Sequence, residues 1–106
     1  MMLKVQIRDR SGQVPLRLKS YTRRKLRRLV RHFDLLTDAE VEFTEESRRS
    51  QEPIHVVDLT VRGIATDLEV LRARESGREL LPVIDLALNK LDGEVTRLKE
   101  KVRPYP

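Results

Sequence analysis

The sequence lacks cysteine and tryptophan, and its only aromatic residues are two tyrosines and two phenylalanines. Without cysteine the chain forms no disulfide bond, no thiolate zinc site and no thiol nucleophile, a composition that fits a reducing cytoplasm. So few aromatic rings disfavour binding of single-stranded nucleic acid by stacking. No apolar run approaches the roughly 18 residues of a membrane span, and residues 1–10 lack the apolar core of a signal peptide. We therefore expect a cytoplasmic protein without a membrane partner.

Motifs for catalysis and cofactor binding are also missing. The four glycines form neither a phosphate-binding loop nor a dinucleotide fingerprint. The two histidines, His32 and His55, stand far apart without the spacing of metal ligands. We therefore expect no catalytic residue, no metal site, no cofactor and no small-molecule substrate. The chain is interpreted as a binding protein and not as an enzyme.

Basic charge is concentrated in one segment. The 106 residues carry a formal net charge of +5, from 22 lysines and arginines against 17 aspartates and glutamates. Residues 17–34 alone contain eight basic side chains and one acidic side chain, whereas residues 35–57 contain six acidic and two basic ones. The net positive charge of residues 17–34 is therefore larger than that of the whole chain. Such a basic segment indicates a polyanionic partner, of which nucleic acid is the commonest.

Hydrophobic periodicity divides the chain into six elements. We expect strands at residues 3–8, 40–44, 55–63 and 71–74, helices at 16–33 and 80–102, a turn at 11–13 and a polar loop at 45–53. This β-α-β-β-β-α order predicts an α+β fold with two helices packed on one face of a four-stranded sheet, as in double-stranded-RNA-binding domains. Residues 1–106 are expected to form one ribosome-binding domain, for reasons given below, with residues 1–103 ordered and residues 104–106 a tail.

The apolar positions of these elements predict the core. Its helical members are expected to be Leu26, Leu29, Phe33, Leu88, Leu91 and Val95. The strand residues beneath them are expected to be Leu3, Val5, Ile7, Val41, Phe43, Leu59 and Val61.

The first helix has one apolar face and one arginine face. On a helical wheel the arginines lie opposite the apolar stripe, and the main ones are Arg23, Arg24, Arg27, Arg28 and Arg31. No acidic residue within the helix relieves their mutual repulsion, although like charges at i,i+4 spacing destabilise a helix. Such a face favours a phosphate-bearing partner over an ordinary solvated surface, because a guanidinium fork engages two oxygens. We predict that these five arginines bind RNA.

The second helix shows a weaker form of the same pattern. One flank of its apolar stripe is basic and the other acidic, with Lys90, Arg97 and Lys101 against Asp85, Asp92 and Glu100. If the basic flank lies beside the first helix, the two basic surfaces merge into one groove, and these three basic residues also bind RNA. Ordinary ion pairs from Glu94 to Lys90 and Arg97 explain the same charges equally well.

Two segments, taken together, resemble a known protein family more specifically than any single motif does. They are KLRRLVRHFD at residues 25–34 and VIDLALNKLDGEVTRLKEKV at residues 83–102, supported by residues 3–24 and 57–63. Together they resemble the ribosome hibernation-promoting factor family, which includes ribosome-associated inhibitor A and was once described as sigma-factor modulators. The resemblance implies a protein that binds the rRNA of the small ribosomal subunit in the channel for mRNA and tRNA. It also implies that such binding keeps ribosomes inactive under stress or in stationary phase.

Three features depart from the family pattern. The second helix opens with Glu79-Leu80-Leu81-Pro82 in place of an acidic residue, Met and Tyr, and the proline requires a helix start near residues 79–81. Gly93-Glu94 replaces a common Arg-Gln pair, which removes a positive charge and weakens the helix by about 1 kcal/mol. The connection after Gly63 is several residues longer. These changes affect the contacts of the second helix more than the fold.

Two other functions fit the same composition. A general double-stranded RNA-binding protein would share the element order and the charge, but it would bind a plain duplex as tightly as it binds ribosomes. A protein–protein regulator would use the acidic segment at residues 38–52 or the open face of the sheet. Its binding would depend only weakly on salt and would require no RNA.

Overall fold

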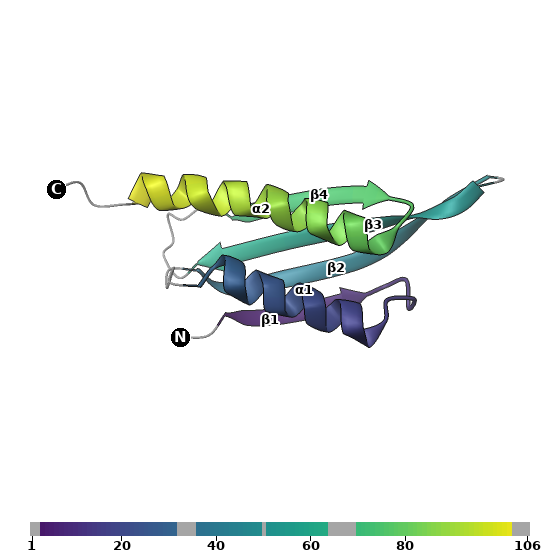
Figure 1. Ribbon diagram of the computed structural model, residues 1–106, viewed down its shortest axis with the longest axis horizontal. Helices are drawn as coiled ribbons and strands as arrows, with labels where there is room; N and C mark the ends of the chain where they lie inside the picture. Colours follow the sequence, from purple (N-terminus) through teal and green to yellow (C-terminus); the bar gives the residue numbers. More distant parts are fainter. Residues whose placement is uncertain (1–2, 32–35, 50, 64–69, 103–106) are drawn as a thin grey trace.

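The computed structural model describes residues 3–31, 36–49, 51–63 and 70–102. Its elements are β1 (Lys4–Asp9), α1 (Leu16–Leu29), β2 (Leu36–Arg48), β3 (Gln51–Gly63), β4 (Leu71–Gly77) and α2 (Leu80–Val102). The strands form one sheet in the order β1-β2-β3-β4, with β1 and β2 parallel and the other neighbours antiparallel. Both helices lie on one face of this sheet, with α1 over β1 and β2 and α2 over β3 and β4 (Figure 1). The predicted α+β fold is confirmed, whereas the likeness to double-stranded-RNA-binding domains stays a prediction.

The core lies between the sheet and the two helices. Alternate residues of β2 and β3 point into it, as the period of a strand requires. The predicted core members that are buried are Leu3, Leu26, Val41, Phe43, Leu59, Val61, Leu88, Leu91 and Val95. Val5, Ile7 and Leu29 are partly buried against the same cluster. Phe33 falls outside the described residues.

The predicted end of the first helix is wrong and the predicted start of the second is confirmed. α1 ends at Leu29 and not at residue 33. The Arg31 N–H bonds to the Arg28 carbonyl at 3.3 Å, an i→i−3 contact that tightens the last turn and closes the α-helical ladder. α2 begins at Leu80, so Pro82 stands in its first turn, where a missing N–H costs nothing.

The segment at residues 45–53, expected to be a loop, forms the far half of a long hairpin instead. β2 continues to Arg48 and β3 begins at Gln51, with Glu45 paired to His55 and Glu46 to Ile54. The two outer strands do not reach this part of the hairpin. β1 pairs with β2 only as far as Phe43, and β4 pairs with β3 only as far as His55. The far half is therefore a two-stranded ribbon that projects from the sheet (Figure 1). A ribbon with solvent on both faces needs no apolar alternation, and its sequence therefore resembles that of a loop.

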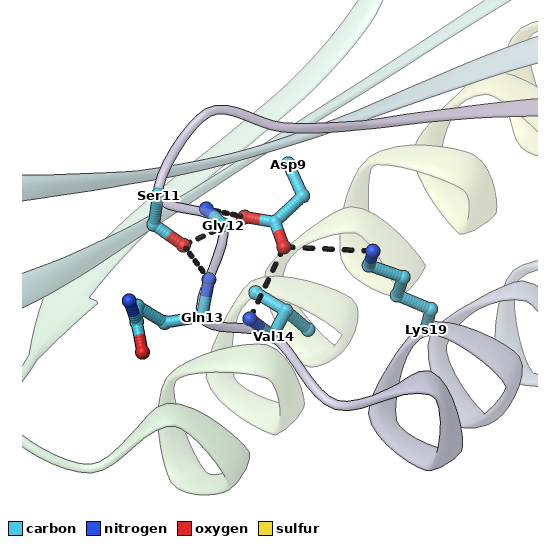
Figure 2. Close-up of polar contacts among 6 residues, drawn as sticks. All are labelled: Asp9, Ser11, Gly12, Gln13, Val14 and Lys19. Atoms are coloured by element: carbon cyan, nitrogen blue, oxygen red, sulfur yellow. Dashed lines mark hydrogen bonds and ion pairs between the residues drawn. The ribbon is translucent and has the colours of Figure 1, made fainter.

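The turn between β1 and α1 is organised around the carboxylate of Asp9 (Figure 2). This carboxylate accepts hydrogen bonds from the Ser11 hydroxyl at 2.6 Å, the Gly12 N–H at 2.9 Å and the Val14 N–H at 3.1 Å. The Lys19 ammonium of α1 lies 3.5 Å from it. Gly12 has φ +70°, a left-handed conformation that favours glycine. The predicted turn at residues 11–13 is thus confirmed, and Asp9 fixes where α1 starts relative to β1.

These contacts also shift the titration of Asp9. Burial by itself would raise the pKa of the carboxyl group, but the hydrogen bonds from Ser11, Val14 and Gly12 and the charge of Lys19 stabilise the anion. The net result is a pKa below the ordinary value for aspartate. The anion therefore stabilises the folded state at neutral pH.

Leu91→Ala should lower the free energy of unfolding by about 2–5 kcal/mol, because Leu91 is fully buried and its truncation leaves a cavity. Urea denaturation measures this change. Leu86→Ala on the exposed side of the same helix is the control, with an expected change within about 0.5 kcal/mol. A loss below about 1 kcal/mol at Leu91 would contradict the packing of α2.

Asp9→Asn should destabilise the protein by roughly 1–3 kcal/mol at pH 7, because the amide cannot replace a carboxylate that accepts three hydrogen bonds. The folded-state pKa of Asp9 is lowered, so its contribution is present above pH of about 4 and is lost as the pH falls through the folded pKa. Urea unfolding from pH 7 to pH 2 should therefore show the wild-type and variant curves converging in acid. A gap that stays constant down to pH 2 would rule out the ionised carboxylate as its cause.

Candidate nucleic-acid interface

The outer face of α1 presents cations without carboxylate partners. Arg24 and Arg28 are exposed, and neither forms an ion pair within the described part of the chain. No acidic residue occurs anywhere in α1 to neutralise them. Because the apolar stripe of α1 faces the sheet, these guanidinium groups point to solvent, where an external anion reaches them.

The other three predicted arginines of this segment differ in exposure. Arg31 is exposed, immediately beyond the helix. Arg23 and Arg27 are half-buried, and the Arg27 Nε–H donates to the Leu3 carbonyl oxygen at 3.3 Å. Arg27 thus ties α1 to the start of β1 and retains its terminal N–H groups for other acceptors. Arg24 and Arg28 are therefore the two predicted arginines that are both exposed and within the helix.

A tyrosine that the sequence did not single out links the two helices. The Tyr21 hydroxyl donates a hydrogen bond to Asp85 Oδ1 of α2 at 2.6 Å. The Arg24 guanidinium carbon lies 5.7 Å from the centre of the Tyr21 ring, and the Lys25 Nζ lies 5.5 Å from it, both within range of cation–π attraction. Tyr21 therefore holds α2 through its hydroxyl and orients two cations through its ring.

The environment of Tyr21 raises the pKa of its hydroxyl. The hydrogen bond to Asp85 is the main cause, followed by burial and the negative charge of Asp85, and Arg24 opposes them. The pairing joins residues that are 64 positions apart, and nothing in the local sequence pattern indicates it.

The predicted merging of two basic surfaces into one groove is wrong. The Lys90 Nζ of α2 lies 3.4 Å from Glu75 Oε2 on β4, on the side of α2 that faces away from α1. Arg97, two helical turns further along the same flank, pairs with Glu94 at 3.7 Å, as the ion-pair alternative predicted. Lys101 belongs to α2, but its side chain is outside the described residues.

The acidic flank of α2 lies beside α1 instead. An open groove of about 400 Å³ separates the helices, with Tyr21, Lys25 and Arg28 on one wall and Asp85, Asn89 and Asp92 on the other. We call this hollow the interhelical groove. The burial of Ile84, Leu88, Leu91 and Val95 sets the rotation of α2, which leaves the basic residues of the two helices on separate surfaces.

The uncovered face of the sheet has a different electrostatic character. Three of its acidic residues on β2 pair with arginines on or just after β1 or on β4. Arg8 lies 3.3 Å from Glu40, Arg10 lies 3.2 Å from Glu42, and Arg74 lies 3.4 Å from Glu46. Glu40, Glu42 and Glu46 of the acidic segment therefore have internal counter-ions, whereas Arg24 and Arg28 of α1 have none among the described residues. Lys4 and Arg72 of the sheet face are also unpaired among the described residues, but they stand apart on the two edge strands, whereas Arg24 and Arg28 lie one helical turn apart on a helix without acidic residues.

No other cluster in the described part of the chain has the chemistry of a site. His55 Nδ1 lies 3.7 Å from Glu45 Oε1 across the hairpin, and His32 falls outside the described residues. Within the described ranges no three His, Asp or Glu side chains gather as a metal-binding group. None of the described helices is both long enough and apolar enough to span a membrane.

Tyr21→Phe should lower the free energy of unfolding by roughly 1 kcal/mol at pH 7, because Asp85 loses its hydrogen bond from α1. The folded-state pKa of Tyr21 is raised, so the stabilisation is present below pH of about 10 and is lost as the pH rises through the folded pKa. Urea unfolding between pH 7 and pH 11 should therefore show the variant and the wild type converging in alkali. Identical stabilities at pH 7 would mean that the Tyr21–Asp85 bond does not hold the helices together.

Comparison with known proteins places this arrangement in a family. Residues 5–103 match the family model described as "Sigma 54 modulation protein / S30EA ribosomal protein". The ribosome hibernation promotion factor of Bacillus subtilis (strain 168) is 33% identical over 96 residues, which cover 91% of this chain and 48% of that protein. The chain thus spans about half the length of this relative.

Two solved structures share the fold. A ribosomal subunit interface protein from Coxiella burnetii has a TM-score of 0.74 at 17% identity and covers 92% of this chain and 99% of its own. The N-terminal domain of Thermus thermophilus Protein Y has a TM-score of 0.68 at 23% identity and covers 92% and 98%. The family resemblance predicted from residues 25–34 and 83–102 is therefore confirmed: the chain belongs to the Sigma 54 modulation protein / S30EA ribosomal protein family.

Proposed function

We propose that this chain binds the rRNA of the small ribosomal subunit in the channel for mRNA and tRNA and keeps ribosomes inactive under stress or in stationary phase. The observation that carries the proposal is the unmatched charge of α1, where Arg24 and Arg28 are exposed without a carboxylate partner among the described residues. Family membership supplies the class of polyanion, since the matching relative is named a ribosome hibernation promotion factor. One of the proteins that share the fold is named a ribosomal subunit interface protein.

The mode of binding follows from the type of side chain. Arginines on a rigid helix suit phosphate oxygens, and phosphate contacts give affinity and orientation with little dependence on base sequence. Folded RNA is recognised mainly through its shape and backbone. We therefore assign the principal contacts to Arg24 and Arg28, supported by Arg23, Arg27 and Arg31.

The basic residues of α2 form a second, separate contact in this proposal. Lys90 and Arg97 are exposed but are paired with Glu75 and Glu94, so their binding to phosphate competes with an existing partner. Exposed pairs of this kind contribute about 0–1 kcal/mol and are readily exchanged. Lys101 stays a predicted member of this contact. This contact is expected to be weaker than that of α1.

The protein is a binding protein and not an enzyme, as its family indicates. We propose that it acts in the cytoplasm as one ribosome-binding domain, without a cofactor, a small-molecule substrate or a membrane partner. Inhibition would then follow from occupancy of the channel, at one molecule per ribosome. Turnover plays no part in such a mechanism.

Of the two alternatives, the protein–protein regulator is disfavoured by the ion pairs of the uncovered sheet face. Glu40, Glu42 and Glu46 are each within ion-pair distance of an arginine, so this surface does not require a basic partner. A general double-stranded RNA-binding protein would use the same α1 face. Competition by a plain duplex separates that function from ribosome binding.

Arg24→Glu combined with Arg28→Glu should abolish co-sedimentation with small ribosomal subunits while leaving the melting temperature nearly unchanged. The affected side chains are exposed and reversal of their charge relieves repulsion within α1, so folding is not at risk. The neutral pair Arg24→Gln and Arg28→Gln should reduce the slope of log affinity against log salt by roughly two, because two fewer counterions are released.

Arg49→Glu with Arg72→Glu is the matched control, because both residues are exposed on the hairpin and the sheet, neither has an ion-pair partner among the described residues, and the charge change is the same. Substitution of Glu42 and Glu46 by glutamine is a second control. Both controls should retain binding. Binding that survives the α1 variant but is lost in the controls would assign the interface to the sheet face.

A further inference from the structure

The two walls of the interhelical groove differ in charge: the α1 wall is basic and the α2 wall is acidic. Tyr21, Lys25 and Arg28 follow one ridge of α1 at i, i+4 and i+7 spacing, and Asp85, Asn89 and Asp92 follow one ridge of α2 with the same spacing. The hydrogen bond between Tyr21 and Asp85 closes one end of the groove. Beyond that bond a cationic wall faces a wall of carboxylate and amide groups.

The polar groups of this groove do not satisfy one another. Asp92 is exposed and forms no hydrogen bond or ion pair with any described residue, and the same holds for Asn89 and Arg28. The ammonium group of Lys25 lies over the ring of Tyr21 and forms no hydrogen bond or ion pair with a described residue. One oxygen of Asp85 is held by the Tyr21 hydroxyl, so Asp92 is the carboxylate with both oxygens available. The groove therefore offers cations and a carboxylate to a ligand at the same time.

The carboxylate of Asp92 lies at the edge of the face proposed to bind phosphate. Asp92 repels phosphate there, and no described residue pairs with it. A carboxylate beside an RNA-binding face is explained if the RNA presents hydrogen-bond donors there. Base edges and the ribose 2′-hydroxyl carry such donors, whereas phosphates do not, and only a base edge presents two adjacent donors to the two free oxygens of Asp92.

We propose that the interhelical groove binds one unpaired guanine nucleotide of RNA, an inference that rests on the proposed RNA-binding function. Lys25 and Arg28 bind the phosphate, and the guanine N1–H and N2–H₂ groups donate to the two oxygens of Asp92. Guanine is the base that presents two adjacent donors on its Watson–Crick edge. Adenine and cytosine place an acceptor nitrogen beside a single amino donor, which a carboxylate repels.

The size and remaining chemistry of the groove fit such a ligand. Its volume of about 400 Å³ lies within the range of roughly 300–1,000 Å³ found for small-molecule sites. Leu29 and Leu88 supply apolar surface between the walls for the face of the base. Asn89, one turn before Asp92, has an amide N–H₂ that suits the guanine O6 acceptor. Recognition through a base edge in an unpaired segment is a common mode of RNA binding and requires little aromatic stacking.

The test uses fluorescence anisotropy with three labelled heptamers of uridine that carry guanosine, inosine or adenosine at the central position. The wild-type protein should bind the guanosine heptamer roughly tenfold more tightly than the adenosine heptamer at constant salt, with inosine between them because it lacks the N2 amine. Asp92→Asn should lose this preference, while its affinity for the adenosine heptamer is unchanged or increased. Glu52→Gln at the exposed hairpin, which removes one carboxylate far from the groove, should behave as the wild type.

Equal affinity of the wild type for the three heptamers would overturn the inference, as would a guanosine preference that survives Asp92→Asn. If an oligo-arginine peptide binds in a manner that requires Asp92 and no heptamer is preferred, the groove is a protein site and the inference is also overturned. Co-sedimentation with small subunits separates these results from the proposed function. Subunit binding without a guanosine preference refutes only the guanine site, and absence of subunit binding refutes the proposed function.

Discussion

A four-stranded sheet with two helices on one face leaves its other face in water, and this constraint governs where the charges of the protein lie. The apolar stripes of α1 and α2 must both face the sheet, where Leu26, Leu91 and Val95 are buried. The arginines of α1 are consequently directed outward, since they occupy the opposite side of the helix. The uncovered sheet face must be stable in water, and cross-strand ion pairs such as Arg8–Glu40 and Arg10–Glu42 meet this requirement. The same burial thus produces a sheet face on which most acidic residues are paired and a helix face on which Arg24 and Arg28 are unpaired among the described residues.

The rotation of α2 then decides what lies next to the α1 arginines. Its apolar stripe fixes the helix on the sheet, and the hydrogen bond from Tyr21 to Asp85 joins its acidic flank to α1. The basic flank is left beside β4, where Lys90 pairs with Glu75. A ligand that spans both helices therefore meets cations on one wall and carboxylates on the other. An RNA backbone alone does not match that arrangement, whereas a nucleotide with a phosphate and a donor-rich base edge does.

The sequence predicted those features that depend on burial. The element order, most of the core and the arginine face of α1 follow from hydrophobic periodicity, because each reflects a single buried side. The hairpin ribbon at residues 45–53 was predicted to be a loop, since a ribbon solvated on both faces leaves no periodic signal. The end of α1 was placed four residues too late, because apolar spacing continues to Phe33 beyond the closing contact at Arg31.

The candidate site was predictable only in part. The five arginines were identified from the helical wheel, but the half-burial of Arg23 and Arg27 and the hydrogen bond from Arg27 to the Leu3 carbonyl are not visible in the spacing. The wheel also gave two flanks for α2 without indicating which one faces α1. That choice depends on the strand order, which places α1 over β1 and β2 and α2 over β3 and β4. The sequence also did not indicate that Tyr21, Lys25 and Asn89 belong to the site, because they come together only through contacts between distant segments.

In the proposed function the unmatched charge of α1 is directed to the small ribosomal subunit and not to duplex RNA in general. The most direct measurement is sedimentation of the protein with purified small and large subunits, repeated with a molar excess of a plain RNA duplex as competitor. The protein should sediment with the small subunit at one copy per particle, and the duplex should not displace it. Displacement by the duplex, or sedimentation with neither subunit, would contradict the claim.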